Sequence, residues 1–591
     1  MKRRHLPIVL FVLVVLAAPY FLSDFRIALT NYIGLYALVA LGLVLLTGIG
    51  GLTSFGQAAF VGLGAYVTAY LSTVHGVSPW INLLVGLGLT LLLAYVIGFV
   101  TLRMSGHFLP LATIAWGISL YYLFGNLDML GGNTGISGIP ALKIISWEIR
   151  SEREFYYLIW VVLLLAMLAV RNLLDSRAGR AIRALKGGVV MAESFGVNTP
   201  RAKMAVFLIA ALTAAISGWL YAHLQRFVNP TPFSLTQGIE FLFMAVVGGI
   251  GHVWGAIAGA LVVTELKQRL QDLLPGLLGQ SGNFEIIFFG IAMVLILQWA
   301  RHGLWSLILR LARRIAPNRS WRRPLAPSGP LPRRSLPASG TVLLEVKEVS
   351  KYFGGLAANQ KMSLNVKAGE VMALIGPNGA GKSTLFNCIS AVNPADGGEI
   401  KFLDERIDAL SAREIARRGM SRTFQHVRLL QQMTVLENVA IGAHLRGRRG
   451  VLAAAMRLNR TEEAGLLAEA ARQIERVGLT EHLFDPAGSL ALGKQRIVEI
   501  ARALASDPCL LLLDEPAAGL RHMEKQALAE LLRKLRAEDI GILLVEHDMD
   551  FVMGLADRVV VMEFGEKLAE GLPQEIQENP LVLEAYLGGV E

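Results

Sequence analysis

The stretch VMALIGPNGAGKSTLFNCISAV, residues 371–392, decides the fold of one half of this 591-residue chain. Its first residues predict a short buried β-strand, and its last residues predict a helix. Between them, Gly376–Thr384 reads GPNGAGKST, which fits the pattern G-x-x-x-x-G-K-[ST] in the setting of strand and then helix that this pattern requires. We therefore predict an α/β nucleotide-binding domain built around this loop.

The chemistry of a phosphate site explains these residue types. Glycines let the backbone wrap a phosphate chain, and the exposed N–H groups and the helix N-terminus attract negative charge. Lys382 would add a full positive charge at the β- and γ-phosphates, and the Ser383 hydroxyl can bind Mg²⁺. The loop residues expected to hold the nucleotide are Gly376, Pro377, Asn378, Gly379, Ala380, Gly381, Lys382, Ser383 and Thr384.

A second strand-like run, CLLLLDEP at residues 509–516, ends in two acids. An acid at a strand end beside a phosphate loop can hold Mg²⁺, so Asp514 is expected to serve the metal. The next acid, Glu515, can orient and polarise an attacking water. A charged turn after a strand is the plainer interpretation, and the phosphate loop upstream favours the functional one.

The first 300 residues are dominated by long apolar runs. Of the whole chain, 53% of residues are hydrophobic and 17% are charged, whereas a soluble protein is about a quarter charged. A helix needs roughly 17–25 mostly apolar residues to cross a bilayer. We therefore predict an α-helical polytopic membrane domain. Its candidate spans lie near residues 6–22, 27–47, 51–71, 81–102, 108–124, 155–170, 204–223, 239–264 and 284–300.

The distribution of Lys and Arg predicts the orientation of these spans. We expect three basic parts of the chain in the cytoplasm: the three positive charges before the first apolar run, the segment 171–203 and the tail after Trp299. An even number of membrane crossings is then required. Glycines at 248–255 can break the stretch 239–264 into two spans or make it a re-entrant segment. Eight or ten crossings satisfy this. The first run could also be a secretory signal, but further spans follow at once.

Few polar side chains interrupt the spans. Ionisable groups at membrane depth usually face a cavity or a partner, and the plainer interpretation is that several lie at solvated span ends. The polar residues in question are Asn31, Gln57, Glu240, His252 and Glu285. The stretch 51–70 is dense in small residues, for which close helix packing is a commoner explanation than ligand contact.

A segment rich in Pro and Arg separates the two halves. Residues 301–340 contain nine arginines and no acid, whereas residues 341–591 carry a net charge of −6. Such a segment cannot build a core, and it predicts a disordered or polyproline-like tether whose arginines can rest on anionic lipid. We divide the chain into a transmembrane domain (1–310), a linker (311–340) and a nucleotide-binding domain (341–591). The acidic last domain disfavours nucleic acid as a partner.

Further motifs around the phosphate loop resemble an ATP-binding-cassette ATPase. They are SRTFQ with Gln425, SLALGKQRIVEIARAL at residues 489–504, the pair Asp514–Glu515, and ILLVEHDMDFV with His547 at a strand end. The resemblance implies ATP and Mg²⁺ as ligands, and Glu515 and His547 as catalytic residues. It also implies that Phe353 stacks on adenine, that Gln425 senses Mg²⁺ and the γ-phosphate, and that Ser383, Gln425 and Asp514 serve the metal.

In this family a signature element caps ATP that is held by another subunit. Here the element would be Leu490, Ala491, Leu492, Gly493, Lys494 and Gln495. Serine is usual at the position of Ala491, so its hydroxyl contact to phosphate is lost. Asp or Asn is commoner at the position of Arg521, and the resemblance links that position to communication between subunits. The Gly493 N–H and the following helix N-terminus can still serve. A second cassette must come from elsewhere.

A narrower resemblance covers nearly the whole chain. KYFGGLAA, DEPAAGL and AEGLPQEIQENPLVLEAYLG look like the ATPase of branched-chain amino-acid importers, in which Ala recurs in the signature. GLTSFGQAAFVGLGAY and AVVGGIGHVWGAIAGAL resemble one of that importer's permease subunits. The resemblance implies a permease fused to its ATPase. It also implies that residues 181–200 dock on the cassette near Gln425.

The implied function is ATP-driven import of branched-chain or similar hydrophobic amino acids. The implied partners are a second permease and a second ATPase, or a second copy of this chain, an extracytoplasmic solute-binding protein and the lipid bilayer. The implied location is the cell (inner or plasma) membrane, crossed many times, with the ATPase domain in the cytoplasm. Import of urea or another small amide or amino acid is one alternative. A membrane-tethered regulatory ATPase without cargo is another, which the number of spans disfavours.

Overall fold

The computed structural model describes residues 6–104, 108–144, 147–278, 284–299, 303–315, 326 and 328–587. The chain forms two compact units. The N-terminal unit comprises residues 1–175 and 200–321, and the C-terminal unit comprises residues 176–199 and 322–591. The short segment 176–199, which interrupts the helical half in sequence, therefore belongs with the nucleotide-binding half.

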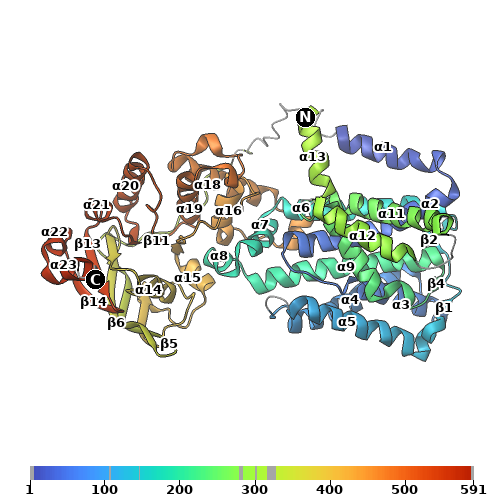
Figure 1. Cartoon of the computed structure of the whole chain (residues 1–591), viewed down its shortest axis with the longest axis horizontal. Helices are drawn as coiled ribbons and strands as arrows, with labels where there is room; N and C mark the ends of the chain where they lie inside the picture. Colours follow the sequence, from blue (N-terminus) through green and yellow to red (C-terminus); the bar gives the residue numbers. More distant parts are fainter. Residues whose placement is uncertain are drawn as a thin grey trace. The chain divides into compact units, whose positions relative to one another are not determined.

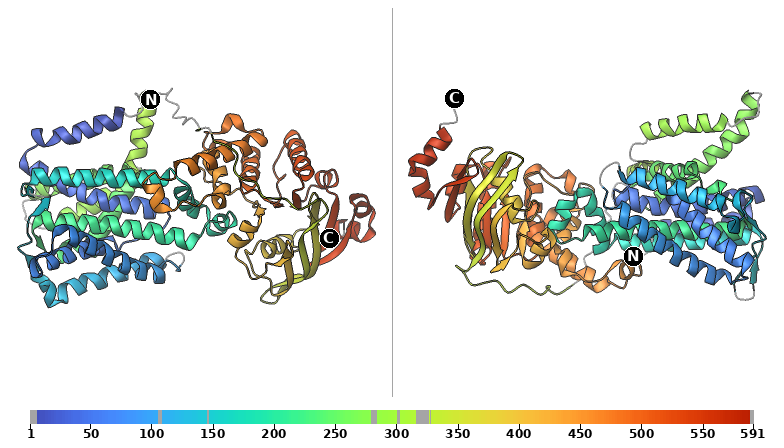
Figure 2. Two further views of the ribbon diagram at one scale, coloured as in Figure 1. Left: turned by 180° about the vertical axis from the view of Figure 1, so that it is seen from behind. Right: turned by 90° about the horizontal axis from the view of Figure 1, so that it is seen from below.

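The N-terminal unit is helical, because a helix pairs the backbone groups of an apolar run within the run itself. Figures 1 and 2 show most of its long helices running side by side. Its helices are α1 (Leu6–Phe21), α2 (Asp24–Leu43) with the π-helical extension η1 (Val44–Ile49), α3 (Gln57–Val74), α4 (Pro79–Thr101), α5 (Phe108–Asn126), α6 (Glu152–Leu174), α9 (Thr199–Gln225), α10 (Leu235–Gly249), α11 (Gly255–Leu278), α12 (Phe284–Trp299) and α13 (Leu304–Ile315).

Among the described residues, five helices are long and apolar enough to cross a membrane: α2 with η1, α4, α5, α6 and α9. Shorter apolar helices fall at Phe11–Phe21, Leu235–Gly249 and Ile287–Ile296. Small antiparallel pairs, β1 (Ile136–Ser137) with β4 (Phe227–Val228) and β2 (Leu142–Ile144) with β3 (Trp147–Ile149), lie in the connections. Short helical turns η2 (Asp128–Leu130), η3 (Gly132–Thr134) and η5 (Thr231–Phe233) complete these connections.

The stretch 239–264, predicted to be divisible at its glycines, is two helices. Helix α10 ends at Gly249, whose φ of +119° an L side chain rarely adopts, and α11 begins at Gly255. A Cβ on Gly259 would lie 1.7 Å from the Met244 carbonyl oxygen, so the two helices pack backbone against backbone. The predicted break is confirmed.

Small residues in the stretch 51–70 serve helix packing. A Cβ on Gly64 would lie 2.3 Å from the carbonyl oxygen of Ala215, and a Cβ on Gly218 would lie 1.9 Å from that of Val61. Helices α3 and α9 therefore approach so closely that only glycine fits at these two positions. This agrees with the packing interpretation of the sequence.

The C-terminal unit is built on a six-stranded sheet with the order β10-β11-β12-β7-β13-β14. Strands β11, β12, β7 and β13 are parallel neighbours. The carboxyl ends of parallel strands meet at one edge of a sheet, which is where ligands bind in such folds. The strands are β7 (Val371–Ile375), β10 (Met420–Arg422), β11 (Leu510–Asp514), β12 (Gly541–Val545), β13 (Arg558–Glu563) and β14 (Glu566–Gly571).

A second, antiparallel sheet has the order β6-β5-β8-β9. Its strands are β5 (Val342–Phe353), β6 (Leu356–Lys367), β8 (Gly397–Phe402) and β9 (Glu405–Arg406). The α-helices of the unit are α7 (Arg177–Ala184), α8 (Val189–Ser194), α14 (Lys382–Ile389), α15 (Ala412–Arg418), α16 (Val435–Gly442), α17 (Val451–Ala455), α18 (Arg460–Arg476), α19 (Leu492–Leu504), α20 (His522–Ala537), α21 (Met549–Met553), α22 (Pro573–Glu578) and α23 (Pro580–Leu587). Short turns are η4 (Leu185–Gly187), η6 (Ala443–Arg446), η7 (Thr480–His482) and η8 (Ala487–Ser489).

The described part of the predicted linker, residues 328–340, differs from a solvated tether. Leu331 packs against the apolar cluster of the helical region that contains α16 and α18, and the Pro332 carbonyl accepts a hydrogen bond from Arg446 Nη2 at 2.9 Å. The half-buried Arg334 donates hydrogen bonds to three carbonyl groups of the C-terminal unit. The linker residues 316–325 and 327 lie outside the described residues.

Candidate functional site

The loop after β7 has the backbone that a phosphate cradle requires. Gly376, Gly379 and Gly381 have φ values of +150°, +85° and +94°. A Cβ on Gly376 would lie 2.1 Å from the Met562 carbonyl oxygen, and a Cβ on Gly381 would lie 2.2 Å from that of Ala358. All three glycines are therefore needed for their conformation, and Gly376 and Gly381 are needed for the space as well. Helix α14 begins directly after Gly381, with no side chain capping its first N–H groups.

Lys382 lies over this loop. Its Nζ donates hydrogen bonds to the carbonyl oxygens of Gly376 at 2.7 Å and Pro377 at 2.9 Å. Burial lowers the pKa of Lys382, and the carboxylates of Glu515 and Asp514 oppose that shift. Both carboxylates are thus close enough to act on the ammonium group of Lys382. The sequence predicted that these three residues belong to one site.

Asp514 ends β11 and is 2% exposed. Its Oδ2 lies 3.4 Å from Arg422 Nη2, whereas its Oδ1 is buried and has no hydrogen-bond partner in the described part of the chain. Burial raises the pKa of Asp514, and Arg422 opposes this shift. A buried carboxylate oxygen without a donor is costly unless a cation or water satisfies it. The arrangement therefore fits a hard cation beside the phosphate loop.

Glu515 is the centre of a cluster of polar side chains. Its Oε1 accepts a hydrogen bond from Gln425 Nε2 at 3.1 Å and lies 3.0 Å from His547 Nε2. Its φ of +48° is uncommon for a residue other than glycine, and such strain is found most often at functional sites. Three sequence motifs that lie far apart in the chain thus meet at one carboxylate.

Two further residues complete this cluster. Arg496 donates from Nη1 to the Glu515 carbonyl at 2.9 Å and from Nη2 to the Gln425 carbonyl at 3.1 Å. Glu546, which precedes His547, accepts hydrogen bonds from the N–H groups of Ala517 at 2.6 Å and His547 at 3.1 Å. Burial raises its pKa, and the charge of Glu515 adds to the shift. Neither Arg496 nor Glu546 was predicted from the sequence, although each adjoins a predicted residue.

The signature residues begin helix α19. Ala491 is its N-cap and makes no side-chain capping bond, so the first N–H groups of the helix are not capped by a side chain. Gln495 Nε2 donates to the Leu490 carbonyl at 2.8 Å, and Lys494 Nζ lies 2.8 Å from His482 Nε2. Leu492 is 52% exposed.

The predicted adenine platform, Phe353, lies at the end of β5 and is 49% exposed. The Nζ of Lys351 is 5.6 Å from the centroid of its ring. The neighbouring Tyr352 is exposed to the same degree. Stacking of Phe353 on adenine stays a prediction.

Comparison with known proteins identifies the family. Residues 25–297 match a family of branched-chain amino acid transport permease components, residues 359–518 match the ABC transporter family, and residues 566–591 match a branched-chain amino acid ATP-binding cassette family. The ATP-binding protein LivG of Escherichia coli, described as a high-affinity branched-chain amino acid transport protein, is 44% identical over 249 residues, which are 42% of this chain and 98% of LivG. This chain belongs to the family of branched-chain amino-acid ABC transporters.

The chain is also similar to a more distant relative and to a solved structure. A probable LivG of Archaeoglobus fulgidus is 36% identical, over 42% of this chain and 95% of that protein. A crystal structure of a nucleotide-free ATP-binding cassette from an ABC transporter is 32% identical, with a TM-score of 0.38, and covers 42% of this chain and 99% of that one. The chain is thus a permease fused to an ATP-hydrolysing cassette.

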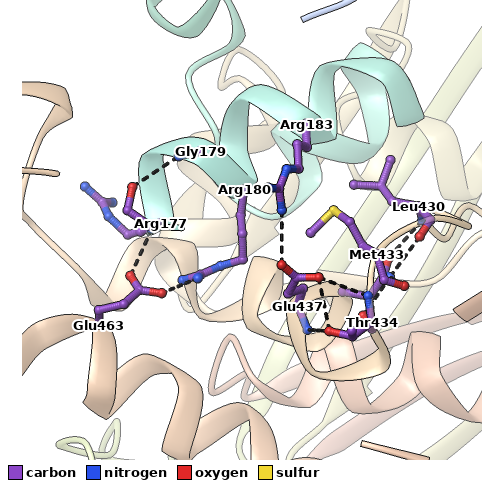
Figure 3. A network of polar contacts seen from close by, with 11 residues as sticks. Arg177, Gly179, Arg180, Arg183, Leu430, Met433, Thr434, Glu437 and Glu463 are labelled. Atoms are coloured by element: carbon purple, nitrogen blue, oxygen red, sulfur yellow. Dashed lines mark hydrogen bonds and ion pairs between the residues drawn. The ribbon is translucent and has the colours of Figure 1, made fainter. Parts of the chain in front are cut away.

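Segment 176–199, here called the docking segment, is held on the cassette by arginines (Figure 3). Arg180 Nη1 forms an ion pair with Glu463 Oε1, and Arg183 Nη1 lies 3.1 Å from Glu437 Oε1. Arg177 donates its N–H to Glu463 Oε2 at 2.9 Å. The acids come from α16 and α18, so the basic face of α7 is complementary in charge to the helical region of the cassette.

Apolar contacts extend the docking segment toward Gln425. Met191, Ala192 and Phe195 of α8 and its C-cap share one buried cluster with Phe424, the residue before Gln425. A Cβ on Gly187 would lie 3.3 Å from Leu430 Cδ2. The docking contacts begin at Arg177, four residues before the predicted segment 181–200. Arg177, Arg180 and Arg183 share one face of the helix α7, so all three contact the cassette.

Proposed function

We propose that this chain imports branched-chain amino acids at the expense of ATP. The helical unit would cross the cell membrane, and the cassette would lie in the cytoplasm. The observation that carries the proposal is the convergence of Gln425 and His547 on Glu515, on a cassette whose helical region holds a basic segment of the permease. The printed functions of LivG and of the matched permease family support the choice of cargo.

The residues of the cassette have distinct parts in hydrolysis. The glycine loop and Lys382 would bind the phosphates, and Gln425 would hold Glu515 in place until nucleotide binds. The carboxylate of Glu515 would accept the proton of the attacking water, and His547 would contact the γ-phosphate and the same carboxylate.

Mg²⁺ would be held by Asp514, Ser383 and Gln425. When bound, the ion neutralises charge on the β- and γ-phosphates. Among the described residues no group of three or more His, Cys, Asp and Glu side chains forms a cage, and Mg²⁺ typically uses one or two carboxylates together with phosphate and water. The unpaired Oδ1 of Asp514 supports this assignment.

The functional assembly would contain two cassettes. The chain carries one phosphate loop and one signature element, Leu490–Gln495, and a site of this family combines a loop of one cassette with the signature of another. We infer a second permease and a second ATPase, or a second copy of this chain, together with a solute-binding protein outside the cell.

The test is Glu515→Gln in the chain purified with its partner subunits. This variant keeps the size and the hydrogen-bonding oxygen of residue 515 but removes the base, so ATP binding should persist while turnover falls at least about a hundredfold. Uptake of labelled leucine into proteoliposomes should stop with it. Wild-type turnover in the variant would refute the assignment of the base. Leucine uptake by the unaltered complex, competed by isoleucine and valine but not by urea, separates the proposed cargo from the small amides.

A further inference from the structure

A polar cavity of about 300 Å³ lies within the N-terminal unit. Small-molecule sites of proteins begin at about this volume. Its polar lining includes Tyr32, Tyr36, Tyr221, Glu240, Thr264 and Lys267, and Leu29, Met244 and Val263 are among its apolar lining residues. The cavity is thus of a size and composition that suit a small amphipathic solute.

Two of the helices that build this cavity, α2 and α9, are largely buried within the N-terminal unit. Over their most apolar windows, α2 is 83% buried and α9 is 61% buried, whereas α4 and α5 are each 28% buried. The lining residues come from α2, α9, α10, α11 and the turn before α10. The cavity is therefore lined on one side by buried helices, α2 and α9, and on another by the less buried α11.

The lining residues share helix faces. Tyr32 and Tyr36 are four residues apart on α2, and Glu240 and Met244 are four apart on α10. On α11, Val263, Thr264, Lys267, Gln268 and Gln271 fall on one stripe. One side of α11 is therefore polar toward the cavity, which explains why its sequence is less apolar than that of the other long helices.

An ion pair between two lining residues lies in the wall of the cavity. Lys267 Nζ lies 2.7 Å from Glu240 Oε1, and the side chains are 36% and 12% exposed. The Thr264 hydroxyl beside it is buried and has no partner among the described residues. An ion pair in an apolar bundle costs desolvation energy that its attraction seldom repays, so such pairs are usually retained for a function.

We propose that this cavity is the site on the transport path that binds the amino-acid head group, with Glu240 receiving the ammonium and Lys267 the carboxylate of a zwitterion. This inference rests on the proposed function and assigns the residues that would contact the transported amino acid. The carboxylate of Glu240 and the ammonium group of Lys267 together balance the two charges of a zwitterion. A ligand that is only an anion or only a cation would leave one of these two side chains unpaired. Leu29, Met244 and Val263 would contact the branched side chain.

The first experiment uses the complete complex in proteoliposomes. Glu240→Gln/Lys267→Met removes both charges while keeping similar volumes, and it should lower leucine uptake at least about tenfold in a complex that assembles in the same amount as wild type. The matched control is Glu265→Gln, since Glu265 also lies on α11 and pairs with Arg26 of α2 at 2.7 Å but does not line the cavity. Uptake by the double variant equal to that of the control would overturn the proposal.

A second experiment keeps the ion pair intact. Thr264→Cys places a thiol in the cavity, and the native Cys388 and Cys509 are buried in the cassette. Leucine at millimolar concentration should slow reaction of the introduced thiol with a methanethiosulfonate reagent at least about fivefold. Leucinamide, which lacks the carboxylate, should not slow this reaction. Equal reaction rates with and without leucine would overturn the site, while leucine uptake by the same complex would still support the proposed function.

Discussion

Phe195 of the docking segment lies against the guanidinium of Arg502, with 4.7 Å between the ring centroid and Cζ. Arg502 donates to Glu499 Oε1 at 2.7 Å and to the Arg428 carbonyl at 2.8 Å, and Glu499 accepts from the Arg428 N–H at 2.9 Å. Both main-chain groups of Arg428 are thus held by the pair that Phe195 touches. A displacement of the docking segment would therefore act on the backbone three residues after Gln425.

Phe195→Ala should uncouple the permease from the cassette. A contact between an aromatic ring and a buried cation contributes about 0.5–2 kcal/mol, and its loss removes the link to the pair Arg502–Glu499. We expect stimulation of ATP hydrolysis by the loaded binding protein to fall at least about fivefold, with basal hydrolysis within about twofold. Val189→Ala, at an exposed position of α8, is the control. Full stimulation of Phe195→Ala would exclude this route.

Arg496 should support the rate of hydrolysis and not the affinity for ATP. Its guanidinium joins the carbonyl oxygens of Glu515 and Gln425, so Arg496→Ala frees the backbone that aims both side chains. We expect kcat to fall about tenfold or more while KM for ATP changes by less than about threefold. Lys534→Ala, on the exposed face of α20, should behave like wild type. A change confined to KM would show that Arg496 acts on nucleotide binding instead.

Much of this site follows from local sequence. The glycines of the phosphate loop, the strand that ends at Asp514 and the order of the motifs placed Lys382, Asp514, Glu515 and His547 without tertiary information. The break near Gly249 could be predicted as well, because a row of glycines in an apolar run favours a break. Such features depend on neighbouring residues, which the sequence displays directly.

Contacts between distant segments could not be predicted in this way. Glu240 was noted as a polar residue in an apolar run, but its partner Lys267 lies beyond the predicted span and was not identified. Arg502 reads as one more residue of an amphipathic helix until Phe195 and Glu499 are seen beside it. The arginines of the linker have no periodicity that distinguishes Arg334 from its neighbours, because its partners are carbonyl oxygens.

His444 should make the docking interface sensitive to acid. Burial, with the charges of Arg177 and Arg180, lowers the pKa of His444 from 6.5 to about 3. Because the unfolded state binds the proton more readily, stability is full above pH 6.5 and falls as the pH drops from 6.5 toward 3, by at most about 1.4 kcal/mol per unit. The melting temperature of His444→Gln should therefore fall less between pH 7.5 and pH 5 than that of wild type. Parallel pH profiles would contradict this assignment.

Arg334 should fasten the linker to the cassette. Its N–H donates to Asp507 Oδ2 at 2.5 Å, and its guanidinium donates to the carbonyl oxygens of Arg418 at 2.6 Å, Arg417 at 2.8 Å and Asp507 at 3.4 Å. Arg334→Ala leaves these three carbonyl groups without this donor, at a cost of about 1–3 kcal/mol.

The matched control is Arg333→Ala, since Arg333 carries the same charge next to Arg334 and is exposed. We expect the melting temperature of the purified complex and the resistance of residues 328–340 to trypsin to decrease for Arg334→Ala alone. Loss of the guanidinium also frees the junction between α15 and β10, because Arg417 and Arg418 end that helix. Equal trypsin sensitivity of the two variants would mean that the linker is held by Leu331 and its apolar neighbours instead.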